Sequence, residues 1–271
     1  MRRTSQVSLD AVAAGYEPVL RAAGPQAGEL GDQLFAVVDA LDASSTLRRA
    51  LSDPARDGDA KAALAAELLV GRADERVVEV LSALARARWS AEGDIADAVE
   101  QLAADSVLAG AQNAGEIQRV EEELFHILRL LAGQRDLRRA LGDRTATPEA
   151  RSELASTVFA STSHPATLQL VARVAKAPRG RGIVASLTEL ERLVAARRRK
   201  LVASVTSAQP LTKAQSARLA TLLETAYGRS VQLNTSVDPD VVGGLRIEVG
   251  SDVVNATVLS RIDDVRRRLA G

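Results

Sequence analysis

The sequence contains no cysteine, and aromatic residues make up only 2 % of it. Disulfide bonds and thiol-ligated metal sites are therefore excluded. With so few aromatic rings, the core must be built from alanine, leucine and valine. Alanine and leucine lose little on entering a helix, and small side chains let helix axes approach closely. The composition therefore favours tightly packed helices.

Net charge is also absent, because 35 lysines and arginines balance 35 aspartates and glutamates. Nothing in this balance attracts nucleic acid or an acidic membrane surface, so partner recognition must be local. No run of 18 apolar residues occurs, and the first twenty residues are too broken for a signal peptide. The chain is expected to be soluble and cytoplasmic, without direct membrane insertion.

Catalytic and metal-binding patterns are scarce. The two histidines, His126 and His164, have neither a cysteine partner nor a surrounding carboxylate cluster, so a metal or triad role is disfavoured. His126 is expected at the edge of a helix interface and His164 has no assigned role. We therefore expect no catalytic residue, no cofactor and no metal, and a chain that is not itself an enzyme.

The chain instead contains an internal repeat. A shift of 90 residues aligns Phe35 with Phe125, and the stretch LRRALSD from Leu47 with LRRALGD from Leu137. Each copy has helical periodicity, and Asp57 and Thr147 are predicted to cap equivalent helices. A duplicated helical segment is favoured over a solenoid, because the unit is long and occurs only twice. The LRRAL arginines are interpreted as helix-terminal residues, with partner binding as the alternative.

The last third of the chain has a different pattern. Alternating residues predict strands over 201–206, 231–237 and 245–249, with a helix from Thr212 to about Tyr227 between the first two. A final helix is expected to carry an apolar stripe that could also accept a partner helix, formed by Val258, Ile262, Val265 and Leu269. The predicted order is strand, helix, strand, strand, helix.

The predicted fold class is mainly α with a small C-terminal α/β module, and the N-terminal bundle contains the duplicated unit of 90 residues. The expected domains are an N-terminal helix and lead-in over 1–27, a first repeat copy over 28–117, a second copy over 118–200, and the module over 201–271.

The C-terminal stretch closely resembles the signature of the delta subunit of F-type ATP synthases, the counterpart of the mitochondrial oligomycin-sensitivity-conferring protein. The pattern begins with Val-Thr-Ser-Ala-x-Pro-Leu at Val205 and continues with Val-Asp-Pro at Val237. Its positions that we expect to be structural are Pro210, Asp238, Pro239, Gly243, Gly244 and Gly250. The chain is longer than the usual subunit by about one repeat, so it looks like a version with a duplicated helical segment.

This resemblance implies a non-catalytic stator subunit. Family members link the alpha and beta subunits of the catalytic head to a b-type peripheral stalk at the cytoplasmic face of the cell membrane. The helical domain of the family binds N-terminal helices of alpha subunits in a groove, so exposed parts of the repeat faces are candidates here. The alternative is a helical adaptor or nucleic-acid-binding protein, because RRRK at 197–200 is basic, although no stacking aromatics flank it.

A nucleotide site at Gly243-Gly244 is disfavoured, since no Lys-Ser or Lys-Thr follows and no helix begins there. The glycines are better explained as a bend that leads into the strand 245–249, after a turn at Asp238-Pro239. An enzyme that uses Asp238, Asp240 and Arg246 is the least favoured hypothesis.

Overall fold

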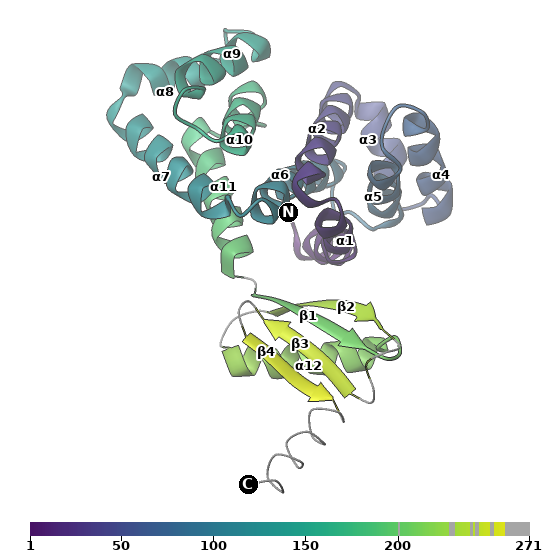
Figure 1. Ribbon diagram of the computed structural model, residues 1–271. Helices are drawn as coiled ribbons and strands as arrows, with labels where there is room; N and C mark the ends of the chain where they lie inside the picture. The colour runs from purple at the N-terminus through teal and green to yellow at the C-terminus, as the bar shows by residue number, and fades with distance from the viewer. Residues whose placement is uncertain (200, 228–230, 239–240, 242–243, 250–251, 258–271) are drawn as a thin grey trace, which may run out of the picture. The chain divides into compact units, whose positions relative to one another are not determined.

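The computed structural model describes residues 1–199, 201–227, 231–238, 241, 244–249 and 252–257. The chain forms two compact units, Met1–Val194 and Ala195–Gly271 (Figure 1). The first unit is helical and the second contains the sheet. A mainly α fold with a small α/β module was predicted and is confirmed. The four domain limits drawn from the sequence stay predictions.

The first half of the helical unit runs from α1 to α6. Its elements are α1 Arg3–Ala22, the short 3-10 helix η1 Gly24–Gln26, α2 Ala27–Ala43, α3 Ser45–Ser52, α4 Gly58–Leu69, α5 Glu75–Arg86 and α6 Asp94–Asn113. The second half contains α7 Ile117–Gly133, α8 Arg135–Leu141, α9 Pro148–Phe159, α10 Pro165–Lys176 and α11 Ile183–Arg199. Helices α2, α4 and α5 recur as α7, α9 and α10 with both bounds shifted by the 90 residues of the sequence repeat.

The repeated LRRAL stretch forms the short helices α3 and α8, each of which follows a break after a longer helix. The first arginine turns back to that longer helix: Arg48 Nη1 donates to the carbonyl of Asp42 at 3.1 Å, and Arg138 Nη1 donates to that of Leu131 at 3.3 Å. Both arginines therefore satisfy helix-terminal carbonyls. The last leucine of each stretch, Leu51 or Leu141, is fully buried. These contacts give the first arginine and the last leucine of each stretch a structural role.

The helix starts are capped in equivalent ways. Asp57 accepts hydrogen bonds from the backbone of α4, and Thr147 accepts one from Ala150 N–H at 3.2 Å, as predicted. His164 is the cap of α10, because its Nδ1 accepts from Ala166 N–H at 3.2 Å. Its counterpart Asp74 caps α5 in the same way. His164 therefore has a structural role, which the sequence did not indicate.

A buried cation joins two helices in each copy. Lys61 of α4 is 3 % exposed and donates from Nζ to Ala87 O at 3.3 Å, just beyond the end of α5. Arg151 of α9 is 8 % exposed and donates to Ala175 O and Lys176 O at 2.8 and 2.9 Å. Arg151 also reaches Asp143 O and Ala146 O. Each cation lies where the dipole of a helix C-terminus is negative.

The second unit is a four-stranded sheet of order β2-β1-β3-β4, with α12 Lys213–Tyr227 between its first two strands in sequence. Its strands are β1 Leu201–Ser207, β2 Val231–Val237, β3 Gly244–Val249 and β4 Asp252–Thr257. Strand β1 pairs in parallel with β2 and antiparallel with β3, which pairs antiparallel with β4. A small core lies between α12 and the sheet, formed by Ala203, Val205, Leu223, Val231 and Ile247.

Strand β4 was missed by the sequence analysis, which expected only three strands before the final helix. Its six residues, DVVNAT, contain too short an alternation to indicate a strand, and pairing with β3 decides their conformation. The start of α12 was predicted and is confirmed: Thr212 Oγ1 accepts from Gln215 N–H, while Gln215 Oε1 accepts from Thr212 N–H at 2.9 Å. This reciprocal pair is a capping box.

Candidate partner-binding grooves

For the grooves we count α1–α5 as the first copy and α6–α10 as the second, because α6 follows α1 by 91 residues and α10 follows α5 by 90. A groove runs along the surface between α1 and α5 of the first copy. It has a volume of about 360 Å³. Small and apolar side chains line it together with two charged ones: Ala11, Val12, Gly15, Tyr16, Val19, Arg76, Glu79, Val80 and Ala83. A Cβ atom added at Gly15 would meet nothing within 4 Å, so the helix surface is open there. Small residues at this spacing allow a further helix to approach closely.

The charged edge of this groove is held in place by the start of α5. Arg76 forms an ion pair with Asp74, with Nη2 and Oδ2 2.6 Å apart. The hydrogen bonds from Arg76 lower the pKa of Asp74 to about 2. Asp74 N–H also donates to Gln33 Oε1 at 2.7 Å, which fixes the loop before α5 to α2. The groove therefore has a fixed polar end and a long apolar floor.

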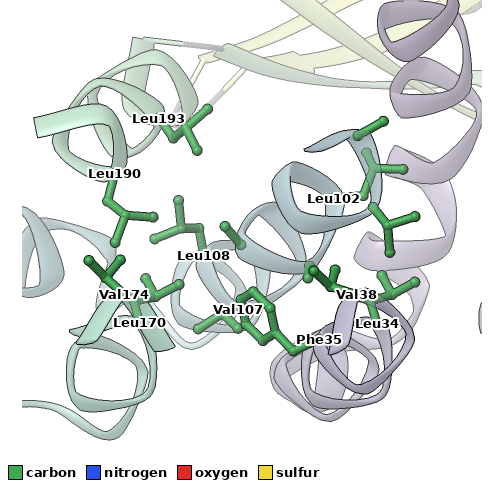
Figure 2. Packing of buried hydrophobic residues seen from close by; sticks show 14 of the residues in the cluster. Leu34, Phe35, Val38, Leu102, Val107, Leu108, Leu170, Val174, Leu190 and Leu193 are labelled. Atoms are coloured by element: carbon green, nitrogen blue, oxygen red, sulfur yellow. The ribbon is translucent and has the colours of Figure 1, made fainter. Parts of the chain in front are cut away.

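The corresponding surface of the second copy lies on α6 and α10, and α2 covers it. Gln169 Nε2 donates to Asp32, Arg173 Nη1 to Asp39, and Lys176 Nζ to Asp39 at 2.9 Å. Phe35 of α2 is 7 % exposed, and the Arg173 guanidinium lies 4.9 Å from its ring centroid. Figure 2 shows Phe35 reaching from α2 toward Val107 and Leu170. The α2 helix therefore lies in a groove of the other copy.

Contact between α2 and α6 is very close. A Cβ atom added at Gly31 would lie 2.8 Å from Ala103 O and 2.7 Å from Val107 Cγ2, so only glycine fits there. The fully buried leucines and valine of α2 belong to one hydrophobic core that contains residues of both copies: Leu30, Leu34, Val38 and Leu41. α2 is thus part of a core that joins the two copies.

A cluster of ion pairs continues the contact between α2 and the α6–α10 groove beyond the end of α10. Arg179 donates to Asp42 at 2.7 and 2.8 Å and forms an ion pair with Asp97 at 3.0 Å. Its Nε lies 3.4 Å from Glu100 Oε2. Arg179 adopts a φ of 48°, a conformation that a residue other than glycine rarely takes. Burial alone would raise the pKa of Asp39, but the hydrogen bonds from Arg173 and Lys176 hold it below its usual value.

Glu100, in the same cluster, has a pKa raised from 4.5 to about 6. Burial is the main cause, opposed by Arg179 and Arg173 and supported by Asp97 and Asp42. The folded chain therefore binds more protons than the unfolded chain between these two values. Because of this linkage, the contribution of Glu100 to the free energy of unfolding falls as pH rises from about 4.5 to about 6.

We expect Glu100→Gln to remove this contribution. The free energy of unfolding of the variant, relative to the unsubstituted chain, should rise by about 1–2 kcal/mol between pH 4.5 and 7.5. Urea denaturation at these two pH values measures the difference. A difference that does not change with pH would show that Glu100 has an ordinary pKa in the folded chain.

Among the signature residues of the second unit, Pro210 is exposed between β1 and α12. Asp238 follows β2: its N–H donates to Ser207 O at 3.0 Å and its carbonyl accepts from Val241 N–H at 3.1 Å. Gly244 opens β3 with a φ of 144°, a conformation that side chains rarely adopt. Pro239, Gly243 and Gly250 lie outside the described residues, as do the predicted partner-binding residues Val258, Ile262, Val265 and Leu269.

No group of three or more histidine, aspartate or glutamate side chains in the described part of the chain is arranged to hold a metal ion. His126 is exposed on α7 beside Phe125, whose ring centroid is 6.1 Å from its own. Within the described ranges, none of the helices has both the length and the apolar character needed to cross a membrane.

The groove residues of α1 and α5 were not identified from the sequence. The small residues Ala11, Ala14 and Gly15 at helical spacing were the available signal. Partner binding was expected on exposed parts of the repeat faces, but the sequence does not indicate which copy is open, because the covering helix comes from the other copy.

The chain matches the family described as ATP synthase delta (OSCP) subunit over residues 99–269, from within α6 onward. It is 49 % identical to the ATP synthase subunit delta of Beutenbergia cavernae over 271 residues, all of both chains. It is 45 % identical to that of Kineococcus radiotolerans, over 98 % of this chain and 97 % of the relative. The identity with the subunit delta of Streptomyces griseus is 39 %, again over all of both chains.

Proposed function

Because the chain belongs to the ATP synthase delta (OSCP) subunit family, we propose that its helical unit binds the alpha subunits of the catalytic head and its C-terminal unit binds the b-type stalk. The chain is a non-catalytic stator subunit of the F-type ATP synthase. It is a peripheral part of a complex that makes ATP, and it has no catalytic role of its own.

The open groove between α1 and α5 is the observation that supports binding to the catalytic head. An amphipathic helix places its apolar face in such a groove, with anchor residues three and four positions apart. The small side chains of the groove floor suit close helix packing, and Arg76 and Glu79 at its edge can fix the register of a charged partner helix. An N-terminal helix of an alpha subunit is the proposed ligand.

The stator task requires tight association rather than chemistry. A chain that binds the head at one unit and the stalk at the other gains effective concentration, because each contact holds the second partner close. The helical unit suits a mechanical load, since the two repeat copies share one hydrophobic core that includes α2. We place the chain at the cytoplasmic face of the cell membrane, peripherally bound through the synthase.

Capture from host membranes tests this function. The tagged full chain is mixed with gently solubilised membranes, and the bound chains are identified at low and moderate salt. We expect alpha, beta and b-type chains at both salt concentrations. Recovery of nucleic acid or unrelated proteins, with the synthase chains absent, would contradict the proposal.

A further inference from the structure

We infer that α2 permanently occupies the groove on α6 and α10. The duplicated chain therefore offers a partner helix one groove, the groove on α1 and α5. This inference rests on the proposed function, since it names which repeat copy receives the head. It also gives the duplication a role: the second groove joins the two copies, and the first remains for the partner.

The two copies differ in the residues that decide this assignment. Positions Gln169, Arg173 and Lys176 of α10 contact the acidic face of α2. Their counterparts on α5 after the 90-residue shift are Glu79, Ala83 and Arg86. Arg173, the central cation, therefore corresponds to a small alanine in the groove floor. The second copy is complementary to α2, while the first copy keeps an apolar floor.

α2 cannot leave its groove at low cost. Its Leu34 and Val38 are fully buried in the hydrophobic core that the two copies share, and Gly31 packs against the backbone of α6. Withdrawal would expose apolar surface from both copies and remove the hydrogen bond from Arg173, which is 8 % exposed, to Asp39. We therefore expect α2 to stay in place when the head binds, and the joint to remain rigid.

A second copy of this chain is the wrong occupant for the open groove. The helix equivalent to α2 is α7, whose Phe125 is 47 % exposed. Asp39 of α2 corresponds to Arg129 of α7, and Lys176 of α10 corresponds to Arg86 of α5. Docking of α7 on the α5 of another chain would bring Arg129 near Arg86, and like charges oppose such a pairing. The groove is thus left to a helix from another protein.

The α2 contact also indicates the chemistry of that helix. α2 presents a glycine at the closest approach, an aromatic residue between the two groove helices, and charges opposite those of α10. By analogy, the partner helix for the α1–α5 groove should carry a small residue, a large apolar anchor, and a basic or amide residue opposite Glu79. An acidic residue should face Arg76 or Arg86.

Crosslinking of α2 in its groove tests the inference. The chain has no native cysteine, so Asp32→Cys with Gln169→Cys gives a single pair, at partly exposed side chains that contact each other. A short, reductively cleavable thiol crosslinker is applied to the free full chain and to the chain bound to purified catalytic head. Each single-cysteine variant is the control for nonspecific reaction. Native mass spectrometry with a synthetic peptide of the alpha-subunit N-terminal helix counts the helices bound per chain.

We expect equal crosslinking in the free and bound chains, head affinity of the crosslinked chain within about threefold of the reduced chain, and one peptide per chain. Loss of crosslinking in the complex would overturn the inference, as would loss of head binding that returns on reduction, or two peptides per chain. A chain that crosslinks fully but binds no head in either form would support the position of α2 and contradict the proposed function instead.

Discussion

Gly15→Trp should weaken binding of the alpha-subunit N-terminal helix by about 100-fold, because an indole at this position fills the groove between α1 and α5. A 100-fold loss corresponds to about 2.8 kcal/mol of binding free energy. A Cβ at Gly15 meets nothing within 4 Å, and removal of a glycine from a helix interior favours the helix. The fold should therefore survive. Calorimetric titration of the full chain with the helix peptide measures the loss.

Gly133→Trp is the matched control. Gly133 lies at the end of α7, outside the groove, and a Cβ there also meets nothing within 4 Å. This variant should bind the peptide as the unsubstituted chain does. Equal binding by all three chains, with unchanged denaturation midpoints, would exclude the α1–α5 groove as the docking site.

Arg151→Met should lower the free energy of unfolding by about 3–5 kcal/mol, because it leaves buried carbonyls without their charged donor. The guanidinium of Arg151 donates to four backbone carbonyls, Ala175, Lys176, Asp143 and Ala146. Methionine fills much of the same volume, so the loss reports the polar contacts rather than a cavity. Urea denaturation at constant pH measures it.

Arg151→Lys keeps the positive charge and changes the geometry of the donors. Lysine is also the residue at the equivalent position of the first copy, Lys61. An ammonium group reaches fewer carbonyls than the guanidinium fork, as the single bond from Lys61 to Ala87 O illustrates. We expect a loss of about 1–2 kcal/mol for this variant. If the free energy of unfolding of the methionine variant lies within about 1 kcal/mol of that of the unsubstituted chain, these hydrogen bonds contribute little net stability.

Local signals in the sequence predicted much of the fold. The caps at Thr147 and Thr212 mark helix starts because their hydroxyl groups satisfy backbone N–H groups a few residues away. The alternation over 201–206 predicted strand β1, in which Ala203 and Val205 are fully buried. Such features depend on neighbours close in the chain, and a single sequence contains them.

The candidate site depends on contacts between the two copies, and the repeated sequence does not indicate them. Phe35 and Phe125 occupy equivalent positions and have the same predicted periodicity, yet the first is 7 % and the second 47 % exposed. The difference arises because α2 has a groove of the other copy to pack against, whereas Phe125 is left at the surface of α7. His164 gave no sequence signal as a cap because histidine is rarely found in that role.

Photocrosslinking in the assembled synthase is the most direct test of the central claim, that the head is held at the first repeat copy of a stator subunit. A photoreactive phenylalanine analogue is placed at Ala11, on the edge of the α1–α5 groove, or at Phe125 on α7. Our account predicts a product with the alpha subunit from position 11 and none from position 125. Alpha-subunit products from position 125 alone, or from neither position in an active synthase, would contradict it.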